Sequence, residues 1–180
     1  MTTKSPIFSL SKKDIFSILF LVITGSAFHF LYDWLNESRL IAWFVPVNES
    51  TWEHLKLLFF PATILTLYEF FKNDKNYDFL TSRILALFLG LISIPILFYS
   101  YKAIVGRDFI VIDILIFVIA VIIFWYMSKF FYNKPAHSSN VLFIIVGSLY
   151  LILFLMFIIF TFYPPTFFLF KDPLTNSYGI

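Results

Sequence analysis

Five long apolar stretches, separated by short polar segments, constrain the fold of this chain more than any other feature of its sequence. A helix needs about 20 apolar residues to cross the hydrocarbon core of a bilayer. The stretches that reach this length cover about residues 15–35, 51–71, 79–101, 109–131 and 141–162. Charged residues make up only 13% of the chain, against about 25% in an average globular domain. The sequence therefore predicts an all-α polytopic membrane protein, with residues 1–180 in a single integral membrane domain.

Two further segments are too short to cross a bilayer or to form a domain. Residues 36–50 hold an apolar run of eight residues, which fits an interfacial or re-entrant segment between the first two spans. Residues 163–180 begin with Tyr163-Pro164-Pro165, which stops the last helix, and form a C-terminal tail. The prediction is thus five spans, one interfacial segment and one tail.

Positive charges in short loops predict the orientation, because Lys and Arg are retained on the cytoplasmic side. With the N-terminus inside, eight Lys and Arg residues fall on the inner side and five on the outer side. We therefore expect a multi-pass protein of the cell membrane with a cytoplasmic N-terminus and an extracytoplasmic C-terminus. His29 and the start of the second span then lie on the extracytoplasmic side.

Charge and cysteine content narrow the classes of partner and chemistry. A net charge of +2 without a basic patch argues against nucleic acid as a partner. Membrane lipids are the expected partners, and the sequence does not identify a protein partner. The absence of Cys excludes disulfides, thiolate metal ligands and a Cys nucleophile.

A polar motif stands at the start of the second span. Residues 48–56, Asn-Glu-Ser-Thr-Trp-Glu-His-Leu-Lys, place seven polar side chains in nine residues. On the first span His29 and Asp33 are four residues apart and project from one face. The first two spans follow each other through a short connection and are expected to pack antiparallel. Two His residues and up to three carboxylates then meet at one depth.

Imidazole and carboxylate groups together suit a divalent metal, of which zinc is the usual choice. The first hypothesis is a metal-dependent, membrane-embedded hydrolase that acts on a lipid or another amphiphile at the extracytoplasmic side. Its expected metal ligands are His29, Asp33 and His54. Its expected catalytic residues are Glu53 as the general base and Ser50 and Lys56 as groups that hold a developing oxyanion. Its expected ligand-binding residues are Asn48, Glu49 and Trp52.

Other interpretations of the motif stay open. Ser50 and Glu53 match the capping box S-x-x-E and can serve the start of a helix alone. Asn48, Ser50 and Lys56 can instead recognise an anionic headgroup in a non-enzymatic binder or transport accessory. A structural membrane subunit is the third alternative. The sequence does not decide whether the protein is an enzyme.

Three groups of residues resemble an uncharacterised family of small bacterial multi-pass membrane proteins. They are His29-x-x-Tyr32-Asp33-Trp34, the string from Pro46 to Lys56, and a tail with Pro164-Pro165, Lys171-Asp172-Pro173 and a final Tyr178-Gly179-Ile180. The resemblance covers nearly the whole chain. It implies a membrane fold in which motif and tail belong to one unit, so that the tail can fold over the site as a lid. It implies no reaction.

Overall fold

The computed structural model describes residues 10–72, 76–134 and 139–180. Every regular element within these ranges is a helix, and one antiparallel bridge joins Lys171 to Tyr178. In chain order the elements are α1 (Lys12–Trp34), α2 (Arg39–Ala42), α3 (Thr51–His54), α4 (Lys56–Lys72), α5 (Tyr77–Val105), α6 (Ile110–Tyr132), α7 (Asn140–Phe162) and the 3-10 helix η2 (Phe168–Phe170).

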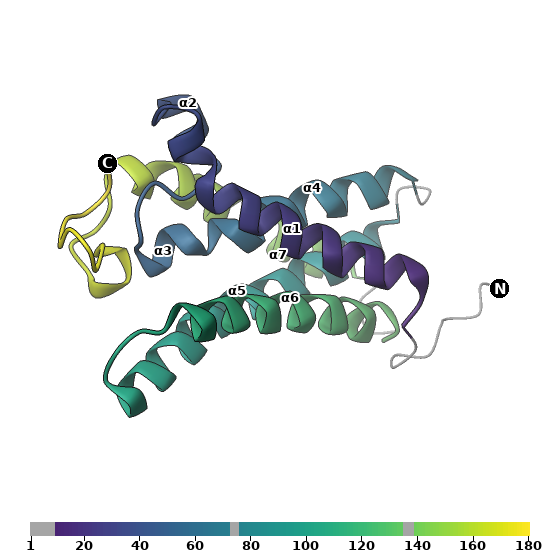
Figure 1. The fold of residues 1–180 in the computed structure, drawn as a ribbon. Helices are drawn as coiled ribbons and strands as arrows, with labels where there is room; N and C mark the ends of the chain where they lie inside the picture. The colour runs from purple at the N-terminus through teal and green to yellow at the C-terminus, as the bar shows by residue number, and fades with distance from the viewer. Residues whose placement is uncertain (1–9, 73–75, 135–138) are drawn as a thin grey trace.

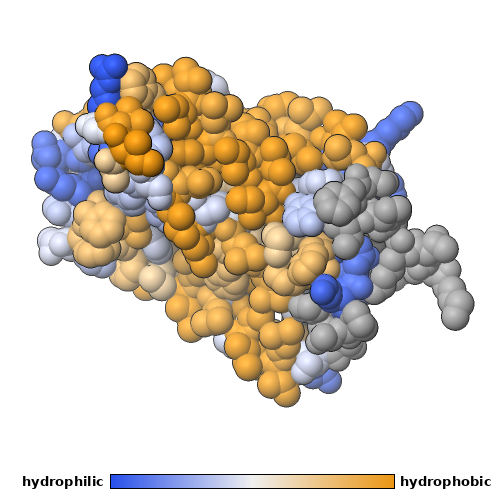
Figure 2. All heavy atoms as spheres, turned by 90° about the horizontal axis from the view of Figure 1, so that it is seen from below, coloured by the Kyte–Doolittle hydropathy of each residue, from blue (hydrophilic) through white to orange (hydrophobic). Residues whose placement is uncertain are grey.

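Five helical segments are long and apolar enough to cross a membrane. They are α1, α5, α6, α7 and the continuous pair α3 and α4. This confirms the predicted all-α class with five spans. On the face drawn in Figure 2, apolar residues cover the middle of the molecule and hydrophilic residues gather toward its two ends. That distribution is the one a membrane-spanning bundle requires.

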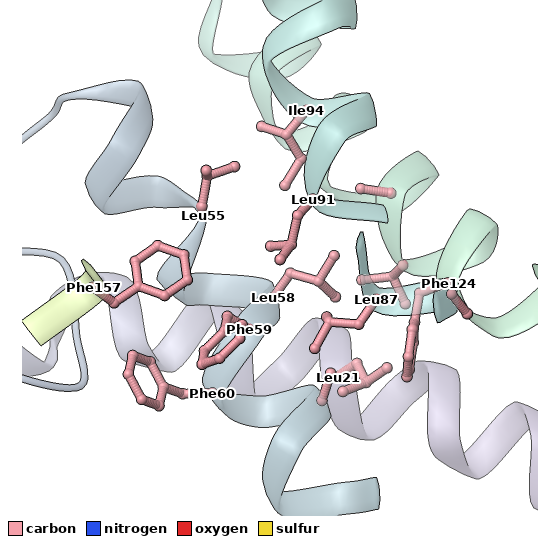
Figure 3. Packing of buried hydrophobic residues seen from close by; sticks show 14 of the residues in the cluster. Leu21, Leu55, Leu58, Phe59, Phe60, Leu87, Leu91, Ile94, Phe124 and Phe157 are labelled. Atoms are coloured by element: carbon pink, nitrogen blue, oxygen red, sulfur yellow. The ribbon is translucent and has the colours of Figure 1, made fainter. Parts of the chain in front are cut away.

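The second span forms the centre of the bundle. Inside the molecule, 61% of its most apolar window is buried, against 11–33% for the other four spans. Figure 3 shows Leu58 and Phe59 of α4 between Leu21 of α1, Leu87 of α5 and Phe157 of α7. Side chains from several helices therefore pack around the start of α4. Functional groups in this region would be held in fixed positions, which favours it as the place of a site.

The segment between the first two spans reverses the chain with little regular structure. Asn36 and Glu37 have φ angles of 51° and 54°, a left-handed conformation that asparagine tolerates better than most residues. One helical turn, α2, follows and is far too short to cross a membrane. Figure 1 shows that α2, α3 and the tail lie together at the end of the bundle where α7 finishes.

Candidate metal site

The polar motif folds into a short helix that leads directly into a long one. α3 begins after Ser50, whose Oγ accepts a hydrogen bond from the N–H of Glu53 at 3.3 Å. The N–H of Ser50 donates to Oδ1 of Asn48 at 3.0 Å. Ser50 thus provides its half of the expected capping box, while Asn48 takes the place of the Glu53 carboxylate in the other half. The Glu53 side chain is left for a different contact.

The ring of His54 is oriented by its own helix. Its Nδ1 lies 2.9 Å from the carbonyl oxygen of Ser50. Because a carbonyl oxygen can only accept a hydrogen bond, Nδ1 carries the proton and donates it. In the neutral ring the other nitrogen, Nε2, then keeps a free lone pair, as in a histidine that is prepared for a metal.

Two more side chains bring their ligand atoms to this Nε2. Nε2 of His29, on α1, lies 3.2 Å from Nε2 of His54. Oε2 of Glu49 lies 3.4 Å from Nε2 of His54 and 3.7 Å from Nε2 of His29. A tetrahedral zinc ion with bonds of about 2.0–2.1 Å separates its ligand atoms by about 3.3–3.4 Å. The three distances therefore match the spacing of ligands around one ion.

Glu49 supplies the negative charge of this group. When His29 and His54 carry a proton on Nε2, they donate hydrogen bonds to the Glu49 carboxylate and hold the pKa of this carboxyl well below its usual range; a cation bound by the three residues takes the place of those protons. The group is therefore a carboxylate at neutral pH. Its side chain is 41% exposed, whereas those of His29 and His54 are 31% and 27% exposed. The three ligand atoms are thus accessible to an ion from outside the bundle.

A cavity of about 320 Å³ adjoins the group, and both Glu49 and His54 line it. The rest of its lining comes from α3, α4, α5, α6, the connection before α6, and the tail. These residues are Thr51, Leu57, Ile94, Phe98, Asp108, Ile110, Asp113, Ile116, Phe117, Pro173 and Leu174. Most of the wall is apolar, so the cavity suits a molecule with a hydrocarbon part.

Asp33 does not join the two histidines. The group of convergent ligand atoms among the described residues consists of His29, Glu49 and His54. Asp33 is exposed near the end of α1, one turn beyond His29. The loop before α3 brings Glu49, which the sequence predicts as a ligand-binding residue, to the position beside the histidines that the sequence predicts for the Asp33 carboxylate.

Glu53 and Lys56 form an ion pair inside the bundle. Nζ of Lys56 lies 2.7 Å from Oε2 of Glu53, and the two side chains are 0% and 3% exposed. Nζ also donates to the carbonyl oxygens of Ala42 and Val45 at 2.9 and 3.2 Å. Its contact with Oγ1 of Thr161, on α7, is 2.5 Å. The ammonium group thus fastens the α2 segment and α7 to the start of α4.

Both oxygens of the Glu53 carboxylate also accept hydrogen bonds from protein groups. Its Oε1 accepts from Oγ1 of Thr161 at 3.1 Å, and its Oε2 accepts from the N–H of Val47 at 3.2 Å. Neither Glu53 nor Lys56 lines the cavity. Ser50 is 1% exposed and caps α3. The geometry therefore favours a structural role for Ser50, Glu53 and Lys56, for which the sequence predicts catalytic roles.

Asn48 and Trp52 hold the tail. Nδ2 of Asn48 donates to the carbonyl oxygen of Gly179 at 3.0 Å. The Trp52 ring packs against Phe157 and Phe170, with centroid distances of 4.8 Å in both cases. Both residues thus attach residues 163–180 to the motif, and their predicted contact with a ligand stays untested.

Residues 2–180 match the model of a family described as a family of unknown function (DUF6512). The chain belongs to DUF6512. No curated protein and no solved structure matches the chain. The DUF6512 match confirms the expected membership of an uncharacterised family and covers the motif and the tail together. It assigns no activity, so the chemistry of this DUF6512 chain has to be argued from its own residues.

Two important residues of this DUF6512 chain were not predicted as parts of the site. Asp113 lines the cavity, although as an acid in the first turn of α6 it is also explained by the helix dipole. Thr161 joins the buried ion pair from a helix without any charge. Asp113 could have been picked out from the sequence, because it is a lone carboxylate at the start of an apolar helix. A single threonine in α7 gives no such signal.

Proposed function

We propose that His29, Glu49 and His54 bind one divalent metal ion, most suitably zinc. The observation that carries the proposal is the convergence of three ligand atoms within 3.2–3.7 Å of one another. The hydrogen bond from Nδ1 of His54 to Ser50 adds to it, because it leaves the Nε2 lone pair directed at the group. A divalent cation between these atoms would accept the imidazole lone pairs and neutralise the charge of the Glu49 carboxylate.

We infer that the metal serves hydrolysis of an amphiphile. Two imidazoles and one carboxylate are a ligand set of catalytic zinc, in which a water molecule takes the fourth position. A metal held by His29, Glu49 and His54 would supply a Lewis acid that activates a bound water toward an ester or amide carbonyl. The oxygen of that water would form the new bond to the carbonyl carbon as the bond to the leaving group breaks, and the proton released by the water would pass to the leaving group. The apolar wall of the adjoining cavity supports an amphiphilic substrate.

Recognition of an anionic headgroup by Asn48, Ser50 and Lys56 is less well supported. Each of the three has its polar side-chain atoms in contact with protein groups. Lys56 is 0% exposed. An anion can reach these groups only if the interior contacts break, which costs several kcal/mol for a buried charge.

We propose that the site lies on the extracytoplasmic side. Lys56 and Arg83 are largely buried and paired with Glu53 and Glu69, so they do not count as loop charges. Without them, seven Lys and Arg residues fall on the cytoplasmic side and four on the site side. The charge bias keeps its predicted direction.

Elemental analysis of the detergent-purified protein after zinc loading and gel filtration tests the metal site. We expect one zinc per chain in the wild type. The variants His29→Ala, Glu49→Ala and His54→Ala should lower zinc affinity by at least about 100-fold, the upper range for loss of supporting groups around a metal. Asp33→Ala is the matched control and should bind as the wild type does.

Two outcomes contradict the metal site. One is a wild-type protein that retains no zinc. The other is zinc that persists in both His variants. Hydrolysis is tested separately, by comparing chelated and zinc-loaded protein on a fluorogenic single-chain ester. A zinc-loaded protein without activity leaves the metal site standing and overturns the hydrolase.

A further inference from the structure

Asp113 is a carboxylate in the cavity that the proposed metal does not explain. It lies in the first turn of α6 and lines the cavity together with His54 and Glu49. The hydroxyl of Tyr101 donates to its Oδ1 at 2.5 Å. Within the described part of the chain its other oxygen, Oδ2, accepts no hydrogen bond. The carboxylate is therefore held in position with one oxygen still available.

The basic residue that the structure places in the lining of the cavity, His54, is assigned to Glu49 and the proposed metal and does not pair with Asp113. None of the residues that the structure places in the lining is Lys or Arg. The neighbouring Asp108 is neutralised by Lys102, whose Nζ lies 2.9 Å from its Oδ2. Glu49 is already matched by the two imidazoles. Asp113 is thus the carboxylate of the lining without a positive partner among the described residues.

Asp113 is half-buried beside an apolar wall, and its charge is stabilised by the Tyr101 hydroxyl and by the start of α6. A ligand that brings a positive group close to Oδ2 would add an opposite charge to these contacts. The wall beyond it is formed by Leu57, Ile116 and Phe117, among others. The volume of about 320 Å³ lies at the lower end of small-molecule sites, which span about 300–1,000 Å³. One hydrocarbon chain with a small head fits this space better than a two-chain lipid does.

We propose that the cavity binds a single-chain amphiphile with an ammonium head, which Asp113 recognises while the chain lies along the apolar wall. The inference rests on the proposed function in one respect: the amphiphile is a substrate only if the neighbouring metal site hydrolyses it. Binding of the amphiphile needs Asp113 and the wall but not the metal.

The test uses metal-free, full-length protein in nanodiscs of zwitterionic lipid. Its thermal unfolding is followed with octyltrimethylammonium, octyl sulfate or octyl glucoside, since a ligand that binds the folded protein raises the melting temperature. We expect octyltrimethylammonium to bind at least about 10-fold more tightly than the other two, a difference of about 1.4 kcal/mol. Asp113→Asn should abolish that preference. Asp78→Asn, an exposed acid in the first turn of α5, should preserve it.

Equal binding of octyl sulfate, or an unchanged preference in Asp113→Asn, overturns the inference. If Asp113→Asn does not fold, Leu174→Trp replaces it, because Leu174 lines the cavity and is 77% exposed. That variant should weaken octyltrimethylammonium binding, and unchanged binding counts against the cavity. His29→Ala separates the two proposals, because His29 does not line the cavity: this variant should lose zinc and keep the ammonium preference.

Discussion

At the scale of single residues, Lys56 shows how the chain accommodates a charge within its apolar bundle. Four acceptor groups surround its Nζ, and one of them is the carboxylate of Glu53. A buried ion pair of this kind is costly to assemble, but breaking it leaves a single charge without compensation. The pair therefore fixes the geometry of the motif although it stands outside the cavity.

The variant Lys56→Met tests this role. It leaves the Glu53 carboxylate buried without its ammonium partner and should lower the free energy of unfolding by about 3–5 kcal/mol. The double variant Glu53→Gln/Lys56→Met should lose clearly less than the sum of the two single variants. Unfolding in mixed micelles with increasing SDS, followed by circular dichroism, measures both.

The control is Lys102→Met, which breaks the pair with Asp108, where both side chains are 37–38% exposed. It should change the stability by less than about 1 kcal/mol, as is usual for exposed pairs. A Lys56→Met protein as stable as the Lys102→Met protein is incompatible with the structural role.

At the scale of elements, the sequence predicts the spans well because each helix carries its own apolar length. It also predicts that His29 and His54 can meet, because the first two spans are antiparallel neighbours. The path of residues 36–50 has no comparable signal. A left-handed turn at Asn36 and Glu37 and the single turn α2 decide that Glu49, and not Asp33, reaches the histidines. Tertiary contacts fix the path of residues 36–50, and such contacts leave no periodic pattern in the sequence.

The contact between α1 and α4 depends on Gly25. A Cβ atom at this position would lie 2.7 Å from the carbonyl oxygen of Leu57 and would also clash with the ring of Phe117. Gly25 lies one turn before His29, so its close approach brings His29 to His54. Small residues at such points are what lets membrane helices come together.

Gly25→Ala should therefore move α1 away from α4 and weaken zinc binding without removing a ligand. Overpacking costs about 1–3 kcal/mol, which corresponds to about 5- to 150-fold in zinc affinity if the whole cost falls on the metal-bound state. Gly147→Ala on α7 is the control, because a Cβ there meets no atom within 4 Å. Competition with a fluorescent zinc chelator measures both variants. Equal affinities would show that the α1–α4 contact does not position the site.

At the scale of the whole molecule, five spans place the start of α1 and the C-terminal tail at opposite ends of the bundle (Figure 1). The candidate site, the α5–α6 connection and the tail share one end, since residues of all three line the same cavity. A single labelled position can therefore report the side of the membrane on which the site lies.

The absence of Cys from the chain makes this measurement direct. Arg107→Cys, in the α5–α6 connection, should react with a membrane-impermeant maleimide in intact cells. Asp78→Cys, at the first turn of α5, should react only after the cells are permeabilised. The reverse pattern would place the site in the cytoplasm and overturn the proposed orientation.

In the proposed site His29 and His54 share one metal ion with Glu49. X-ray absorption spectroscopy of the zinc-loaded protein can detect this arrangement, because multiple scattering counts the imidazoles around the ion. We predict two imidazole nitrogens at about 2.0–2.1 Å from the zinc, with oxygen atoms as the remaining ligands. The His54→Ala protein, loaded at a high zinc concentration, should show one imidazole. A spectrum of the wild type with one imidazole or none would contradict the shared site.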